Sequence, residues 1–411
     1  MSGIVSTLPR WWMHVAPWFQ STSVWHYQGG KRDLRLDFLR GFAVVAMVVD
    51  HIGGARSWLY VITGGGLFFV SVAEVFVFIS GLLMGSINAG LIARQGLGTV
   101  LMKCLQRSGR LYLLTLTLTL LLAALSRQWG LWEVPVPWSD FILSVVTLHR
   151  TFPLTDIPLL YTLLVLAAVP VFILLTHGYT SIVLAGSWGL WALWHLAPQH
   201  AQFPWAIADN EIFSFSAWQV LFITALVIGY HRQRLEQYMI RLSLPVVLMI
   251  SGACVASAIA LYTFNLLPRL TDNAVLVYQL FSKADLGPGR LLVFASFLIF
   301  GFTLLTVAWV PISRACNWLI LPLGQNALTA YTLHLFVVAC LIKARPWMAV
   351  TTFTPEVQNT LLQAIGVMGI WVMISLQPVL VMQYHKWIVK AMSLFTPTNA
   401  LPWRAIAARS R

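Results

Sequence analysis

The sequence predicts an all-α polytopic membrane protein with about ten transmembrane helices. Of its 411 residues, 59% are hydrophobic and only 9% are charged, whereas a soluble domain carries about 25% charged residues. Apolar stretches of about 20 residues, the length that crosses a bilayer core, recur along the chain. The 19 Trp and 23 Phe residues are typical of lipid-facing surfaces and of the aromatic belts at membrane interfaces.

Ten stretches are long enough to span the membrane. The second contains Gly81, Gly85 and Ser86, which weaken its helical pattern, and the fifth is short. No internal repeat is visible, which disfavours an inverted-repeat transporter. In chain order, the predicted spans are 38–58, 67–90, 110–127, 157–176, 181–197, 214–230, 244–264, 290–310, 319–342 and 361–382.

The remaining segments complete one domain. Residues 1–30 lack the apolar core of a removable signal peptide. The long connections mix Pro, Trp and charged residues, as in WEVPVPWSD and FPWAIADNE, and we predict that they form ordered caps over a mouth. We therefore expect a cytoplasmic N-terminal segment at 1–37, a transmembrane domain at 38–383 and a basic cytoplasmic tail at 384–411.

The distribution of charge predicts the orientation. Most of the 26 Lys and Arg residues lie on the side of the predicted spans that holds both chain ends. The positive-inside rule therefore places both termini in the cytoplasm. The net charge of +13 has the same origin, so we expect no nucleic-acid partner. The four Cys residues have no paired spacing, and they predict neither a disulfide nor a metal site.

The segment 31–54, KRDLRLDFLRGFAVVAMVVDHIGG, carries ionisable residues into the first predicted span. Such residues cost at least ~2.5–3.5 kcal/mol at a bilayer centre, so they indicate function. Arg40 and His51 lie about 20° apart around a helix and ~16 Å apart along it. We therefore expect both to face one cavity. The alternatives are that Arg40 extends to the interface as an anchor and that His51 is a hydrogen-bonded packing residue.

Glu74 lies at about the same predicted depth as His51, ~10 Å below the outer surface. A buried carboxylate orients an imidazole and stabilises the imidazolium, so the pair predicts that His51 is a general base. Asp50 is adjacent to His51 but points about 100° away on the same helix, which makes it a poorer partner. The alternative for Glu74 is a structural hydrogen bond to a neighbouring helix.

Arg107 and Arg110 lie three residues apart at the inner end of the third span, at a level comparable with Arg40. Three guanidinium groups at one mouth suit a polyanion such as the phosphates of a nucleotide-containing donor. Membrane anchoring by positive residues is the alternative. Other polar side chains lie at helix entries or within spans, and His334 among them is expected to pack or to line a cavity. These residues are Tyr161, Trp218, Gln219, Lys283, Arg290, Tyr331 and His334.

The ordered blocks of this sequence resemble the OpgC-type membrane acyltransferases, the osmoregulated periplasmic glucan succinyltransferase family within the acyltransferase-three superfamily. The superfamily's Arg-ten residues-His motif corresponds to Arg40 and His51, its SG motif to Ser80 and Gly81, and its RxxR motif to Arg107 and Arg110. The resemblance covers about residues 31–340. The matching blocks are RLDFLRGFAVVAMVVDHIGG, EVFVFISGLLMG, RSGRLYLL, DIPLLYTLLVLAAVPV, FSAWQVLFITALVIGY, ADLGPGRLLVFASFLIFGF and LPLGQNALTAYTLH.

The resemblance implies a multi-pass acyltransferase of the bacterial inner membrane. It would move an acyl group from cytoplasmic acyl-CoA (succinyl-CoA or acetyl-CoA) to a hydroxyl of a periplasmic glucan or another surface glycan. Succinyl is the first candidate for the acyl group. His51 would act as general base, with Glu74 or Asp50 orienting it. The sequence leaves open whether transfer is direct or passes through an acyl-histidine, and whether the chain forms a homodimer.

The remaining candidates have supporting roles in this hypothesis. Lys283 or Arg290 would bind the free carboxylate of a succinyl group, and one hydroxyl or amide would stabilise the oxyanion. The rival interpretation is a proton-coupled transporter or flippase of an anion or a lipid-linked substrate. A structural subunit of an envelope complex is the third. The oxyanion candidates are Ser80, Tyr161, Gln219 and Tyr331.

Overall fold

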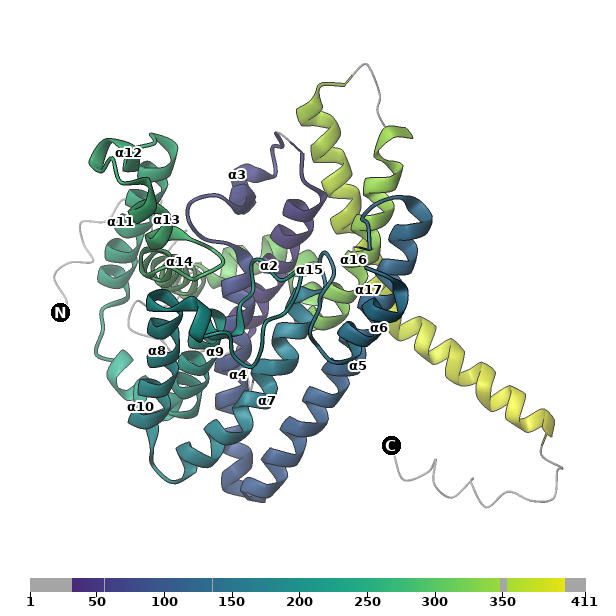
Figure 1. Cartoon of the computed structure of the whole chain (residues 1–411), viewed down its shortest axis with the longest axis horizontal. Coiled ribbons are helices and arrows are strands. Elements are labelled where there is room, and N and C mark those ends of the chain that lie inside the picture. The colour runs from purple at the N-terminus through teal and green to yellow at the C-terminus, as the bar shows by residue number, and fades with distance from the viewer. Residues whose placement is uncertain (1–31, 55, 135, 348–352, 396–411) are drawn as a thin grey trace, which may run out of the picture.

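The computed structural model describes residues 32–54, 56–134, 136–347 and 353–395 (Figure 1). These residues form a bundle of α-helices, and they include an isolated backbone bridge between Arg150 and Ala208. The elements are α2 (Leu34–Ile52), α3 (Tyr60–Thr63), η3 (Gly64–Gly66), α4 (Val72–Gln95), α5 (Leu97–Trp129), α6 (Trp138–Val146), α7 (Asp156–Thr176), α8 (Thr180–Leu196), η4 (Pro198–His200), α9 (Phe215–Tyr230), α10 (Arg232–Met239), α11 (Leu244–Thr263), α12 (Leu267–Leu270), α13 (Ala274–Phe281), α14 (Pro288–Val307), α15 (Trp309–Gln325), α16 (Ala327–Ala344), η5 (Arg345–Trp347) and α17 (Pro355–Phe395).

The prediction of an all-α membrane protein is confirmed. Within the described ranges, seven helices are long and apolar enough to cross a membrane. The predicted spans at 38–58, 181–197 and 214–230 correspond to further helices, so the predicted number of ten remains a prediction. The orientation of the termini also remains a prediction. Residues 1–31 of the predicted N-terminal segment and residues 396–411 of the predicted tail lie outside the described residues. The seven helices are α4, α5, α7, α11, α14, α16 with η5, and α17.

The helices differ from several predicted spans, as α5 does by beginning at Leu97 and not at residue 110, and two of the differences have a clear local cause. The first span was expected to continue to residue 58, but α2 ends at Ile52 because Gly53 and Gly54 both have positive φ angles (66° and 119°); glycine favours this conformation at a helix end. The expected span 319–342 crosses the junction of two helices at Asn326, where α15 ends and α16 begins. A single junction residue leaves the average hydropathy high, so the sequence pattern did not reveal it.

Close packing around α2 and α4 determines where the polar side chains lie. A Cβ atom on Gly41 of α2 would lie 2.0 Å from the carbonyl oxygen of Ile320 in α15, and one on Gly81 of α4 would lie 2.2 Å from that of Phe222 in α9. Helix axes approach this closely only over small residues. The glycines that weakened the predicted second span therefore form a packing surface, and α2 runs through the centre of the bundle (Figure 1).

Candidate functional site

Two cavities lie along α2. The first, the His51 cavity, has a volume of 630 Å³ and is lined on α2 by Met47, Asp50 and His51. The second, the Arg40 cavity, has a volume of 290 Å³ and is lined on α2 by Arg40. Since the helical rise is about 1.5 Å per residue, Met47 and Arg40 are roughly 10 Å apart along the axis. Among the described residues, no side chain lines both cavities.

His51 contacts a second histidine. Its Nδ1 lies 3.0 Å from Nε2 of His334, which is fully buried in α16. The Nδ1 of His334 is hydrogen-bonded to the carbonyl oxygen of Tyr331. A carbonyl oxygen only accepts, so His334 Nδ1 carries a proton and, in the neutral ring, Nε2 is the acceptor. His51 Nδ1 must then donate to it. This leaves the lone pair of His51 on Nε2, the nitrogen free to serve the cavity.

The expected contact between Glu74 and His51 is not formed. The Glu74 side chain is fully buried, and its Oε1 accepts a hydrogen bond from Arg290 Nε at 2.5 Å. Its Oε2 accepts from the backbone N–H and the hydroxyl of Ser71, which caps the first turn of α4. Arg290 is thereby held against Glu74. The alternative for Glu74, a structural bond to a neighbouring helix, is the observed arrangement.

Charged side chains from several loops line the His51 cavity. Asp50 lies in the cavity wall, and its buried Oδ1 has no hydrogen-bond partner among the described residues. Lys283, from the loop before α14, lines the same cavity, and its Nζ lies 5.6 Å from the ring centre of Phe213. Glu133, Asp209 and Glu211 fall in the loops that the sequence predicted as caps, whereas Asp156 begins α7. The further acidic lining residues are Glu133, Asp156, Asp209 and Glu211.

The Arg40 cavity is basic. Arg40, Lys103 and Arg107 line it, and the buried Nε of Arg40 has no hydrogen-bond partner among the described residues. Arg110 was expected at the same mouth, but it is exposed and is not part of the lining. Three residues along α5 advance the chain by about 4.5 Å and turn it by 300°, which carries Arg110 past the cavity. Lys103 was not predicted, although it lies one turn before Arg107.

Ser80 and Tyr161 lie between the two cavities. Ser80 lines the Arg40 cavity, and its hydroxyl is 3.1 Å from the hydroxyl of Tyr161. Tyr161 lies in α7 one turn after Ile157, which lines the His51 cavity. This hydrogen-bonded pair therefore links the wall of the Arg40 cavity to the helix whose first turn lines the His51 cavity.

Three other predicted residues are held in the packing of the bundle. Trp218 is fully buried and donates from Nε1 to the carbonyl oxygen of Ile212 at 2.9 Å. The amide of Gln219 accepts from Ser187 and donates to backbone carbonyl oxygens. The hydroxyl of Tyr331 donates to the carbonyl oxygen of Leu154 at 2.6 Å. Neither Gln219 nor Tyr331 is thus positioned as an oxyanion donor, because each already uses its donor within the fold.

The arrangement as a whole places a base-competent imidazole at one end of α2 and a group of cations towards the other. Comparison with known families adds a direct result. The model of the family described as OpgC protein matches residues 32–381. No curated protein and no solved structure matched the chain. Because the family match covers most of the 411 residues, the chain belongs to the OpgC family, and this membership indicates a membrane acyltransferase.

Proposed function

We propose that this protein transfers an acyl group from cytoplasmic acyl-CoA to a hydroxyl of a periplasmic glucan or another envelope glycan. Succinyl is the first candidate for this acyl group. The bacterial inner membrane is the proposed location. The single observation that carries the proposal is the pair of consecutive hydrogen bonds that connects the Tyr331 carbonyl oxygen to His334 and His334 to His51. It supports a neutral His51 whose Nε2 lone pair serves the larger cavity, as a general base requires.

The Arg40 cavity supports a binding site for the donor's phosphates. Arg40, Lys103 and Arg107 supply positive charge, and the unpartnered Nε of Arg40 gives a buried donor that a phosphate oxygen would satisfy. Arg40 and His51 are about 16 Å apart along α2. A donor that is bound by its anionic end and reacts at its other end must therefore be long and narrow, which fits the extended arm of coenzyme A.

In the proposed reaction, the acceptor hydroxyl binds in the His51 cavity and gives its proton to His51 Nε2. The acceptor oxygen attacks the thioester carbonyl, the C–S bond breaks, and the leaving thiolate takes the proton from His51. During this step His51 Nδ1–H still donates to His334, so positive charge on the ring is stabilised by an oriented acceptor. The carboxylates of the cavity supply acceptors for the other hydroxyls of a glycan.

Lys283 is the proposed partner of the free carboxylate of a succinyl group. It lines the same cavity as His51, whereas Arg290 is paired with Glu74 inside the bundle. Of the two cations predicted to bind this carboxylate, only Lys283 therefore supports the proposed specificity for a dicarboxylic acyl group.

The direct test uses acyl-CoA that carries an isotope label in the acyl group, with the protein reconstituted in vesicles. Covalent label on an added glucan supports the proposal. Counterflow of intact substrate without labelled glucan would support a transporter instead. His51→Ala should abolish labelling while the protein still inserts and folds, and label transfer by this variant at the parent rate would refute the role of His51.

A further inference from the structure

A third cavity lies beside the N-terminal end of α2, away from both cavities of the proposed reaction. It has a volume of 490 Å³, which is within the range of about 300–1,000 Å³ typical of small-molecule sites. Its lining residues belong to neither the His51 cavity nor the Arg40 cavity. Most of its wall is apolar and comes from α4, α9, α11 and α14, with Phe78, Leu82, Ile228, Val247 and Leu298.

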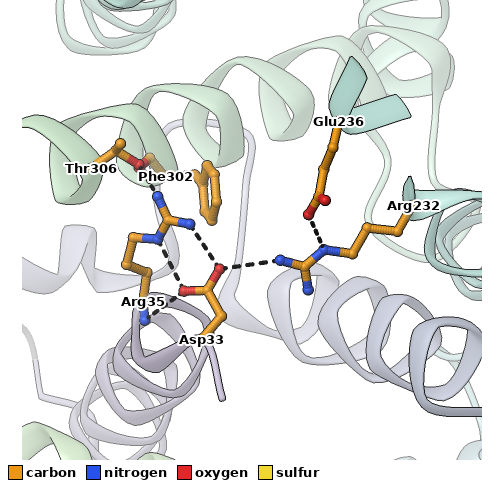
Figure 2. A network of polar contacts seen from close by, with 6 residues as sticks. All are labelled: Asp33, Arg35, Arg232, Glu236, Phe302 and Thr306. Carbon is orange, nitrogen blue, oxygen red and sulfur yellow. Dashed lines mark hydrogen bonds and ion pairs between the residues drawn. The ribbon is translucent and has the colours of Figure 1, made fainter. Parts of the chain in front are cut away.

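A row of alternating charges borders this cavity (Figure 2). Arg35 is buried and fully engaged, since it binds Asp33 through Nε and Nη2, at 2.9 and 2.8 Å, and Thr306 through Nη1 at 2.8 Å. Its guanidinium also lies over the ring of Phe302. Arg232 contacts Asp33 at 3.5 Å and Glu236 at 2.8 Å. The rim thus has two cations and two carboxylates, and its net charge is zero.

Only the α10 half of this rim is accessible. The side chains of Arg232 and Glu236 are 35% and 38% exposed, whereas those of Arg35 and Asp33 are 3% and 6% exposed. A ligand at the mouth would therefore meet one guanidinium and one carboxylate. A head group with one positive and one negative charge matches this pair, whereas a purely anionic head group would be repelled by Glu236.

The position of the cavity identifies the surrounding medium. α4, α11 and α14 are each long and apolar enough to cross a membrane, so in a bilayer the apolar space between them would face lipid. Ile240 and Leu242, which follow α10 and line the cavity, are 63% and 52% exposed. Large apolar side chains next to a charged helix are typical of segments that lie at a membrane interface. The cavity and its rim together have the polarity of an amphiphile.

We propose that this cavity binds one zwitterionic glycerophospholipid, with an acyl chain in the apolar cavity, the phosphate beside Arg232 and the ammonium beside Glu236. This site is independent of the proposed acyl transfer, because it shares no residue with the reaction cavities. The lipid would fill the space between α4, α9 and α14 and tie α10 to the bundle.

Native mass spectrometry of the full chain from nanodiscs with equal amounts of phosphatidylethanolamine and phosphatidylglycerol tests the site. We expect one retained phosphatidylethanolamine. Leu298→Trp fills the cavity and should weaken retention about tenfold, equivalent to about 1.4 kcal/mol. Leu292→Trp is the matched control, because Leu292 lies on the same helix, is 72% exposed and does not line the cavity. If Leu298→Trp does not fold, Leu298→Phe serves the same purpose.

The head-group assignment has its own variant. Glu236→Gln leaves the rim with one excess positive charge and should shift retention towards phosphatidylglycerol, whereas Glu356→Gln, which lies outside the cavity, should not. Equal retention of lipid by the parent and Leu298→Trp would overturn the proposal. So would a chain that retains lipid only after deletion of residues 1–30, because that result would assign the cavity to the N-terminal segment.

Discussion

Replacing His334 by Ala tests the two consecutive hydrogen bonds on which the proposed mechanism depends. The variant removes the acceptor of His51 Nδ1–H, which lies 3.0 Å away. A hydrogen bond to a charged group contributes about 1.5–3 kcal/mol, and His51 is charged in the proposed transition state. Since each 1.36 kcal/mol changes a rate tenfold, we expect kcat to fall about 10- to 150-fold. Without its acceptor, His51 can also adopt the tautomer that places its proton on Nε2.

The assay is transfer of labelled acyl groups from acyl-CoA to glucan, normalised to folded protein, because His334 is fully buried and its truncation also costs stability. His334→Gln retains a side-chain oxygen that can accept from His51 and should recover a large part of kcat. Thr332→Val is the control, because Thr332 is a half-buried residue of the same helix whose hydroxyl donates to the Leu328 carbonyl oxygen and not to either histidine. If His334→Ala and His334→Gln lose kcat equally, or if neither loses any, the tautomer argument is wrong.

Three further predictions follow from the structure, two of them with a control variant. Arg107→Ala removes a cation from the Arg40 cavity, so it should raise the KM for acyl-CoA about tenfold and the KM for the acceptor less. Arg110→Ala is the control and should change neither KM strongly. Glu74→Gln leaves its buried arginine partner unpaired and should destabilise the fold by about 3–5 kcal/mol, seen as a lower Tm, with kcat of the folded fraction retained. Gly81→Ala should destabilise by about 1–3 kcal/mol through overpacking, whereas Gly109→Ala, with open space around its Cβ position, should stabilise by up to about 1 kcal/mol.

Each of these predictions has an outcome that would contradict it. A larger effect of Arg110→Ala than of Arg107→Ala on the KM for acyl-CoA would move the donor site away from the Arg40 cavity. Loss of kcat without loss of Tm in Glu74→Gln would restore the catalytic role that the sequence predicted for Glu74. Equal melting temperatures for the two glycine variants would mean that α4 and α9 are not closely packed at Gly81.

The sequence by itself determined the membrane class, the position of most helices and the placement of Arg40 and His51 on α2. These properties depend on local composition and on the helical period, which a single segment carries. The two glycines after Ile52 even contain the signal that ends α2, although a hydropathy average does not register it. The family resemblance was likewise readable from ordered blocks along the chain, and the family match confirms it.

Only the tertiary structure decided which side chains meet. His51 and His334 are 283 residues apart, and Glu74 and Arg290 are 216 apart. Sequence depth placed Glu74 level with His51, but depth does not specify which helices are neighbours or how each is rotated about its axis. Packing of α2 against α16, and of α4 near α14, settled those rotations. A buried polar group forms hydrogen bonds with the groups that packing brings within reach. The partner of the candidate base therefore depends on how the helices pack.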